Sequence, residues 1–586
     1  MLKTIVKKFR LLLGKLRERA PIRIDDQEFE HLLLYHGLVG TSPDNQRSFK
    51  DVRVDISDAV RSASSVQLGI ALKLEPLHWQ DKLETIFTEL AGAQQENIVK
   101  ALLPDAESEP WPNMGDPLGH DNWRVRANAA FVLALLDAKE GQDRIIKSLH
   151  DTAFGASPAF CHVAYALSKF QTDASKEALV SHLEDPEPWF RIDAAGALAN
   201  FPAAEVKETI IKALLTINPL SDYLAVTIAK KYSVLELLDE GDDQLRNGGC
   251  QLLGGLAEAA NQTFNPDILQ NIDLLQCVQK LLELVKRHRS VHALLALWNV
   301  LVLLREKSAD LEIDQSSQSI AKIEAEIEGE LHSKSSISQI EFTLSTYAKK
   351  RAVTTNVELQ DAIKLAGALK LTTTTNNLLE LLKVASPLQE QIVFALGQAG
   401  DARSISSLLE LANSLYKPEE RTSPSLSSKT VEENDTNKAK LYWRILEALG
   451  NLPSKLTVQF LFKAAADFAP DKRQQVLESL CNLVSSLTPE ERTQLNQLVS
   501  ESLEDPSAPV KVSALKGVAA LAAVSYLDKV LKLSESLEPS ISRQALQTLA
   551  QLSYSGDATV LAAIKSKIAQ ESDPTRKKRL ENVLKS

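Results

Sequence analysis

Apolar residues recur at helical spacing in paired segments along most of the chain. In the stretch SPLQEQIVFALGQAGDARSISSLLEL (386–411), apolar positions repeat every three or four residues, first over 392–399 and again over 405–411. Gly400 separates the two runs, as is typical of a helix C-terminus, and Ser386-Pro387 is typical of a helix start. The pattern predicts two helices joined by a tight turn.

Variants of this helical pair return at a nearly constant interval. The shared pattern is an acidic residue, a basic residue a few positions later and then alanine and leucine, and it is found in 121–136, 185–201, 505–521 and 538–552 and, without the alanine, in 573–584. Arg126 and Arg191 are 65 residues apart, which is two repeats, and the last three segments start 33 and 35 residues apart. Such a period is typical of a repeat array in which each unit packs on its neighbours.

Each position of the repeat has a structural interpretation. An acidic residue caps free amide groups at a helix start, a following proline needs no hydrogen-bond partner, and alanine pairs let helices approach closely. Thr488-Pro489-Glu490-Glu491 predicts a capping box. We expect each basic residue to reach the acidic cap of an adjacent repeat, which makes a structural ladder rather than a catalytic site. Its residues are Asp121, Arg126, Asp185, Arg191, Asp505, Lys511, Glu538, Arg543, Asp573 and Arg576.

These patterns predict an all-α fold, a right-handed α–α superhelix with essentially no strand. We divide it into a basic N-terminal helix (1–19), a degenerate helical region (20–120), a first half of repeats (121–305), a polar seam (306–345) and a second half (346–586). Residues 414–438 are rich in Ser, Thr, Glu and Lys, a composition that cannot offset the entropy of ordering, and we expect a disordered insertion there.

Residues 1–19 predict a basic amphipathic helix. They hold seven of the 66 Lys and Arg residues and one of the 77 Asp and Glu residues. One interpretation is binding to an anionic membrane or an acidic partner; the other is docking of the apolar face on the first repeat, with an organellar targeting peptide as a third. The residues that form the helix are Leu2, Lys3, Ile5, Val6, Lys7, Lys8, Phe9, Arg10, Leu12, Leu13, Lys15, Leu16 and Arg17.

Composition narrows the class of partner and the compartment. The net charge of −11 argues against a general nucleic-acid binder, which needs a basic surface. The sequence contains no run of 18 apolar residues, so we expect no transmembrane helix. The four cysteines are far apart and predict small core positions rather than disulfides. We therefore expect a cytoplasmic protein, peripheral on the cytoplasmic face of a membrane if residues 1–19 bind lipid.

One internal basic run interrupts the repeats, at Lys286, Arg287, His288 and Arg289. It is either a site for an acidic partner or phosphate, or a solvated turn between two helices. His288 and His292 are one helical turn apart, but no third metal ligand lies near them in the sequence, so we expect no metal.

The segments DPEPWFRIDAAGAL, ALGQAGDARSISSLLEL and DPSAPVKVSALKGVAAL resemble HEAT repeats, and more narrowly the short HEAT-like repeats of the phycobilisome-lyase class. The resemblance covers 121–305 and 365–586. It implies an α-solenoid, and it implies a role as scaffold, adaptor, assembly factor or, in a minority of such proteins, bilin lyase subunit.

No nucleotide-binding, hydrolase or metalloprotease motif is present, so we expect no enzyme activity and no cofactor. The leading hypothesis is a scaffold that binds protein partners on the concave face of the solenoid. The alternatives are a bilin lyase or isomerase subunit, or a factor that handles phycobiliproteins, and a carrier of flexible cargo peptides.

Overall fold

The protein is described from a computed structural model of the whole chain. The residues it describes are 92–103, 116–120, 123–150, 159–186, 188–217, 221–263, 266–269, 272–307, 317–350, 356–384, 386–415, 433–467, 470–554, 558–571 and 573–584. Within these residues all regular structure is helical, and no strand occurs. The prediction of an all-α solenoid is confirmed.

The chain folds as two compact units, which divide between Gly255 and Leu256, inside one long helix. The first unit contains, as α-helices, α6 (Gly92–Leu102), α7 (Trp123–Leu135), α8 (Gln142–His150), α9 (Ala159–Lys169), α10 (Asp173–Ser181), α11 (Pro188–Leu198), α12 (Ala203–Leu214), α13 (Asp222–Ala229), α14 (Val234–Leu238) and the start of α15 (Asp243–Thr263). Single 3-10 turns join them at η2 (Pro117–Gly119), η3 (Lys139–Gly141) and η5 (His182–Glu184).

The second unit continues the series from the end of α15. Its α-helices are α16 (Leu274–His288), α17 (Val291–Lys307), α18 (Ser317–Leu331), α19 (Lys334–Lys350), α20 (Val357–Ala368), α21 (Thr375–Leu382), α22 (Gln389–Ala399), α23 (Ile405–Leu415), α24 (Glu433–Leu449), α25 (Lys455–Asp467), α26 (Pro470–Asn482), α27 (Pro489–Ser502), α28 (Ala508–Ala520), α29 (Leu527–Leu533), α30 (Pro539–Tyr554), α31 (Ala558–Gln570) and α32 (Pro574–Val583). Its 3-10 turns are η6 (Pro266–Leu269), η7 (Thr372–Thr374), η8 (Ser386–Leu388), η9 (Ala402–Ser404), η11 (Val484–Ser486) and η12 (Val524–Tyr526).

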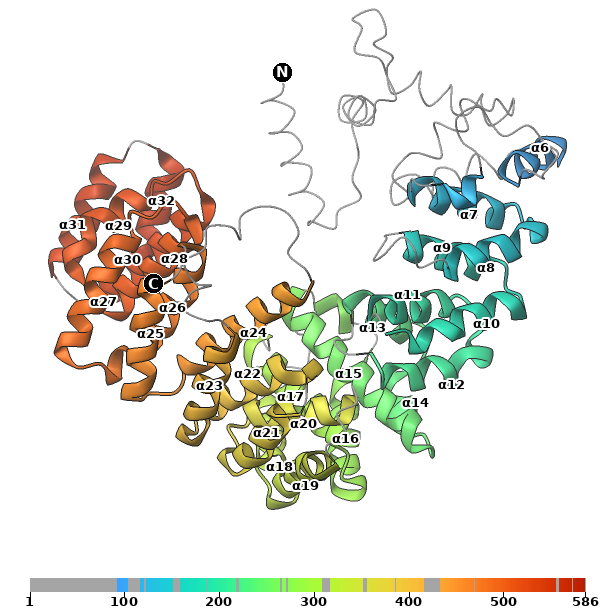
Figure 1. Cartoon of the computed structure of the whole chain (residues 1–586), viewed down its shortest axis with the longest axis horizontal. Helices are drawn as coiled ribbons and strands as arrows, with labels where there is room; N and C mark the ends of the chain where they lie inside the picture. The colour runs from blue at the N-terminus through green and yellow to red at the C-terminus, as the bar shows by residue number, and fades with distance from the viewer. Residues whose placement is uncertain are drawn as a thin grey trace, which may run out of the picture. The chain divides into compact units, whose positions relative to one another are not determined.

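The helices of each unit form two rows with different spacing (Figure 1). In the first unit α7, α9, α11 and α13 pack on one another in turn, whereas α8, α10 and α12 contact their own row much less. In the second unit the closely packed row is α20, α22, α24, α26, α28 and α30, and the sparse row is α19, α21, α23, α25, α27 and α29. We call these the close row and the open row of each unit.

Small residues explain why one row is close. The alanine pair Ala129-Ala130 on α7 and its counterpart Ala194-Ala195 on α11 are buried, as the repeat pattern predicts. On α20, a Cβ atom added to Gly367 would lie 2.9 Å from the Cα atom of Ala395 on α22. A side chain at position 367 therefore has no room unless the two helices move apart.

Local caps and turns follow the sequence closely at several positions. Thr488 and Glu491 form the predicted capping box at the start of α27, where each side chain accepts the other residue's backbone N–H. Gly400 ends α22 in the left-handed region with φ of 71°. Both features use residue types that the local backbone requires, so the sequence predicts them without tertiary information.

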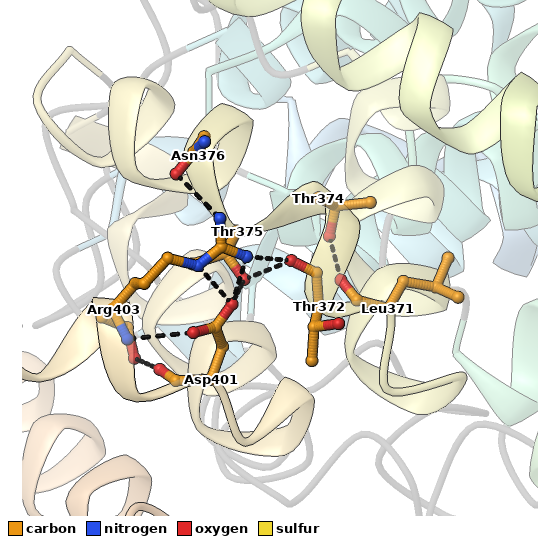
Figure 2. Close-up of polar contacts among 8 residues, drawn as sticks. Leu371, Thr372, Thr374, Thr375, Asn376, Asp401 and Arg403 are labelled. Carbon is orange, nitrogen blue, oxygen red and sulfur yellow. Dashed lines mark hydrogen bonds and ion pairs between the residues drawn. The ribbon is translucent and has the colours of Figure 1, made fainter.

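Polar contacts join consecutive repeats in the loops beside the open row. Figure 2 shows the best developed example, in which the Arg403 guanidinium group pairs with Asp401 and donates to the backbone oxygen of Thr372 at 2.6 Å. The Thr375 hydroxyl donates to the same Asp401 carboxylate at 2.9 Å. Residues 372 and 375 belong to the repeat before Asp401, so this cluster ties two repeats together.

Some boundaries differ from the prediction. The helix α22 begins at Gln389, after a 3-10 turn over 386–388, instead of at Ser386. The helix α24 extends back to Glu433, inside the predicted insertion 414–438, and α23 continues to Leu415; positions 416–432 lie outside the described residues. The predicted polar seam contains α18 and the start of α19, and Ile327 and Leu331 of α18 are buried. Periodic leucine and isoleucine residues in a polar segment are enough to anchor these helices.

Candidate protein-binding surface

Two large aromatic side chains project from the close row of the first unit. Trp189, in the first turn of α11, is 66% exposed, and Tyr223, in the first turn of α13, is 65% exposed. Exposed aromatic groups that lie near one another mark interaction surfaces more often than scattered aliphatic residues do. The neighbours of these two residues therefore define the candidate site.

Helical spacing puts Trp189, Asp193 and Gly196 on one face of α11, because they are four and then three residues apart. Gly196 leaves room for the tyrosine of the next close-row helix: a Cβ atom added there would lie 3.5 Å from Cε1 of Tyr223. The Tyr223 ring therefore rests against the last turn of α11, on the same face as Trp189 and Asp193.

Asp193 is the acidic centre of this face. Burial raises the pKa of its carboxyl group to about 6, and a hydrogen bond from the Cys161 thiol on α9 partly opposes that rise. Although Cys161 is exposed as a whole residue, burial of its thiol, together with the charge of Asp193, raises the thiol pKa to about 12. The thiol stays protonated at neutral pH and acts as a hydrogen-bond donor rather than a nucleophile.

Tyr165, one helical turn after Cys161 on α9, extends the face toward α7. Its ring stacks on Phe131 with a centroid separation of 6.4 Å, and the Lys169 ammonium group lies 5.0 Å from its centroid. Burial raises the pKa of the Tyr223 hydroxyl, with smaller contributions from Cys161, Tyr165 and Asp193, so these groups share one electrostatic environment. We call Tyr165, Trp189, Asp193 and Tyr223 the aromatic surface.

The repeat arginines contact their own repeat in the structure. Arg126 donates to the backbone oxygen of His120, and Arg191 donates to that of Asp185 and, at 3.2 Å, to that of Pro186. Arg246 on α15 makes the same contacts, to the oxygens of Glu240 at 2.7 Å and Gly241 at 2.8 Å. The long side chain folds back over the loop before its helix, because the carbonyl groups there have no helical partner.

The acidic ladder residues have several kinds of partner. Asp505 pairs with Arg473 of the preceding repeat at 3.1 Å, and it also accepts the backbone N–H of Ser507. Asp185 contacts Nδ1 of His182 at 3.2 Å. Asp121 lies outside the described residues. Lys511 lies on α28, and Glu538 is the residue before α30. Asp573 contacts Arg576 at 4.0 Å within one repeat, and Arg543 lines a cleft described below.

The basic run 286–289 ends α16, where all four side chains are exposed and Arg289 adopts φ of 49°. His292 lies apart from it, buried in α17, and its Nδ1 atom is 2.6 Å from Oδ2 of the buried Asp361 on α20. The imidazole is therefore occupied by a carboxylate 69 residues away. Sequence spacing did not indicate this pair, because nothing local links the two positions.

The predicted helix 1–19 lies outside the described residues, so its binding role stays a prediction. In the part of the chain that the structure describes, no helix is both long and apolar enough to cross a bilayer. The expectation that all four cysteines are core residues is wrong for Cys161; Cys250 and Cys277 are buried, and Cys481 is intermediate. Cys161 differs because its thiol has a polar partner at the surface, the Asp193 carboxylate.

Trp189 and Tyr223 were not indicated as site residues by sequence spacing. The only local signal is an aromatic residue in the first turn of a repeat helix, where most other copies have a small or polar residue. That signal does not say whether the ring is buried, because burial depends on the neighbouring repeats.

Comparisons with known proteins agree with the stacked helical pairs. Residues 116–199, which contain α7 to α11, match the family model described as HEAT repeats. No curated protein is similar enough in sequence to count as a relative.

Several solved structures resemble this chain at low similarity. One is an engineered protein with 16% identity and a TM-score of 0.28, covering 78% of this chain and 98% of that one. Importin β has 10% identity and a TM-score of 0.35, covering 96% of this chain and 81% of that one. Kap95p with RanGDP has 12% identity and a TM-score of 0.34, covering 99% of this chain and 79% of that one.

The family match covers residues 116–199, and similar packing continues through the other described helices. Consecutive helical pairs stack in two rows, alanine pairs lie between close-row helices, and arginines cover the loops before them. The narrower resemblance to phycobilisome-lyase repeats stays a prediction. The chain is an all-α solenoid of stacked helical pairs, and its residues 116–199 match HEAT repeats.

Proposed function

We propose that this solenoid is a non-catalytic scaffold or assembly factor that binds a protein partner through the aromatic surface of its first unit. The observation that supports the proposal most directly is the exposure of Trp189 and Tyr223 around Asp193. Aromatic groups of this kind contribute most of the binding energy in protein interfaces, because they bury a large area at a small cost in side-chain entropy.

We place the partner on the concave face. In a curved stack of helical pairs the inner row has the shorter spacing, and the aromatic surface belongs to the close row. Asp193 adds a preference for a partner with a basic side chain, because no cation among the described residues pairs with this partly buried carboxylate, which gains from one.

The test is quantitative affinity capture from cells that make the protein, using the full chain and a Trp189→Ala/Tyr223→Ala double variant. Phe342→Ala is the matched control, since Phe342 on α19 is as exposed as Trp189 but lies outside the close row. We expect specific partners to be lost from the double variant and retained by the control. Equal recovery by all three proteins contradicts the proposal.

A second part of the proposal concerns residues 1–19, whose sequence pattern favours recruitment to an anionic membrane. Liposome flotation of the full chain against a chain lacking 1–19 tests it. Flotation that depends on anionic lipid and disappears on truncation is expected. If neither protein floats, the segment has another role, such as docking on the repeats.

The competing bilin lyase or isomerase hypothesis needs a reactive group. The thiols of Cys161, Cys277 and Cys481 all have pKa values raised by burial, to about 12, 11 and 12. These values do not favour an activated thiolate at those positions. Co-purification of a coloured chromophore with the protein is the result that favours the lyase hypothesis over the scaffold.

A further inference from the structure

A cleft lined by three arginines lies near the C-terminal end of the second unit. Two adjoining hollows, of about 190 and 470 Å³, share Ser536, Leu537, Ser542, Leu546 and Arg579 in their walls. Arg576 lines the smaller hollow and Arg543 the larger one. We call this feature the arginine cleft. It is formed by α30, α32 and the loops before these two helices, all within one unit.

Within the described part of the chain, two of the three guanidinium groups have no hydrogen-bond or ion-pair partner. Among the described residues, no hydrogen bond or ion pair involves the side chain of Arg543 or of Arg579, and both residues are exposed. Arg191 and Arg246, which occupy the corresponding place in their own repeats, both bond the carbonyl groups of the preceding loop. In α30 it is Ser542 that bonds this loop, through a 2.7 Å hydrogen bond to the oxygen of Ser534. Arg543 is thus left facing the cleft.

The acidic residues around the cleft are largely engaged elsewhere. Glu535 forms an ion pair with Lys567 of α31, and Asp573 lies 4.0 Å from Arg576. Glu571 accepts the backbone N–H of Asp573 at 3.0 Å and is the remaining carboxylate in the lining. The cleft therefore presents two unpaired positive charges against one carboxylate, in a chain whose net charge is −11.

The walls between the charges are apolar. Leu537 is 93% exposed, the largest exposure of any large hydrophobic side chain in the described part of the protein, and Leu546 and Leu580 line the adjacent surface. A ligand that fits both features combines an anionic group with an apolar one a few ångströms away. An isolated inorganic anion leaves the leucine surface uncovered.

We propose that the arginine cleft binds an acidic segment of a protein partner, in which a Glu or Asp side chain lies beside an apolar side chain. The carboxylate pairs with Arg543 and Arg579, whose planar guanidinium groups suit it, and the apolar side chain covers Leu537. A singly charged carboxylate matches the single excess positive charge, whereas a dianionic phosphate meets repulsion from Glu571. The site is independent of the aromatic surface, which belongs to the other unit.

Fluorescence anisotropy with defined peptides tests the assignment on the full chain. The probe is a short fluorescein-labelled peptide with Glu-Leu pairs in a Gly-Ser background, compared with twins that carry Gln-Leu or phosphoserine-Leu pairs. We expect the Glu peptide to bind and the Gln peptide to bind at least about tenfold more weakly. Added salt is expected to lower the affinity of the Glu peptide.

The matched variants are Arg543→Gln/Arg579→Gln and, as control, Lys578→Ala, an exposed residue of α32 outside the cleft lining. The double variant is expected to lose the preference for Glu over Gln while its circular dichroism stays unchanged, and the control is expected to keep that preference. Equal binding of the Glu and Gln peptides to the native protein overturns the proposal, as does the absence of binding by any peptide. Tightest binding of the phosphoserine peptide overturns the choice of a carboxylate.

Discussion

Gly397 of α22 faces Ala448 of α24 at a distance that excludes any side chain: a Cβ atom added to Gly397 would lie 2.5 Å from the Ala448 Cα atom. The two helices are neighbours in the close row of the second unit. Their backbones touch because neither residue has more than a methyl group at the contact, so the spacing of the row depends on the smallest residues in it.

Gly397→Ala tests this contact. We expect a loss of about 1–3 kcal/mol in the free energy of unfolding, because the overpacking cost at a backbone contact exceeds the gain of about 1 kcal/mol in helix propensity. Gly329→Ala is the control, since nothing lies within 4 Å of a Cβ there and the residue is exposed in the last turn of α18. That substitution is expected to stabilise the protein by at most about 0.5 kcal/mol, because the propensity gain is smaller at a helix end than in its interior. Urea titration followed by circular dichroism measures both; equal effects contradict the close contact.

Asp401 provides a test of the cluster in Figure 2. Hydrogen bonds and charge from Arg403 lower the pKa of its carboxyl group from 3.8 to about 2. The unfolded chain therefore binds a proton before the folded one as the pH falls, and the stabilisation is lost between about pH 4 and pH 2. Asp401→Asn is expected to cost about 1 kcal/mol at neutral pH, a value discounted because Arg403 is half exposed. The cost should vanish at the acid end of a pH series of urea titrations.

Asp193 is expected to make stability depend on pH in the opposite direction. Its pKa is raised from 3.8 to about 6 by burial, so the folded state holds a proton that the unfolded state has already released. Stability then falls as the pH rises from about 4 to about 6 and is level above that range. Asp193→Asn is expected to stabilise the protein by about 2 kcal/mol at pH 7 and to leave stability at about pH 4 unchanged. A difference between the two proteins that is the same at all pH values argues against the raised pKa.

Lys231 links two repeats in the first unit. Its ammonium group donates to the backbone oxygens of Ala199 and Phe201, just beyond the end of α11, and burial lowers its pKa. Lys231→Met leaves these carbonyl groups without a charged donor, and we expect a loss of about 1–3 kcal/mol. Lys230→Met, an exposed neighbour, is the control. Hydrogen exchange of amides at the end of α11 should accelerate in the first variant only.

Local features of this fold could be predicted from the sequence, and contacts across repeats could not. The Thr488 capping box and the Gly400 helix end depend on a few adjacent residues, and the structure confirms both. The repeat arginines were recognised from their spacing, but their partners depend on how the loop before each helix folds. His292 and Asp361 meet only because α17 and α20 pack together, and no sequence pattern connects them.

The candidate site was harder to predict for the same reason. Trp189 has the sequence environment of a core residue, in the first turn of an apolar repeat helix. Its exposure depends on how the neighbouring repeats pack, which is a property of several helices rather than of one. The lack of side-chain partners for Arg543 and Arg579 among the described residues could not be predicted either, because an unpaired charge is recognised only when its neighbours in the fold are known.

The unequal spacing of the two rows has a mechanical consequence. Backbone contacts such as that of Gly367 with Ala395 leave no room for close-row helices to move toward each other. Open-row helices are joined mainly by side-chain contacts, such as Lys207 with Glu240 and Arg403 with the backbone oxygen of Thr372. Within each unit, bending should therefore change the spacing of the open-row helices and leave the spacing of the close-row helices nearly constant. Surfaces on the close row then keep their geometry while the unit bends. The close row is therefore the side on which a fixed arrangement of contacts can be maintained.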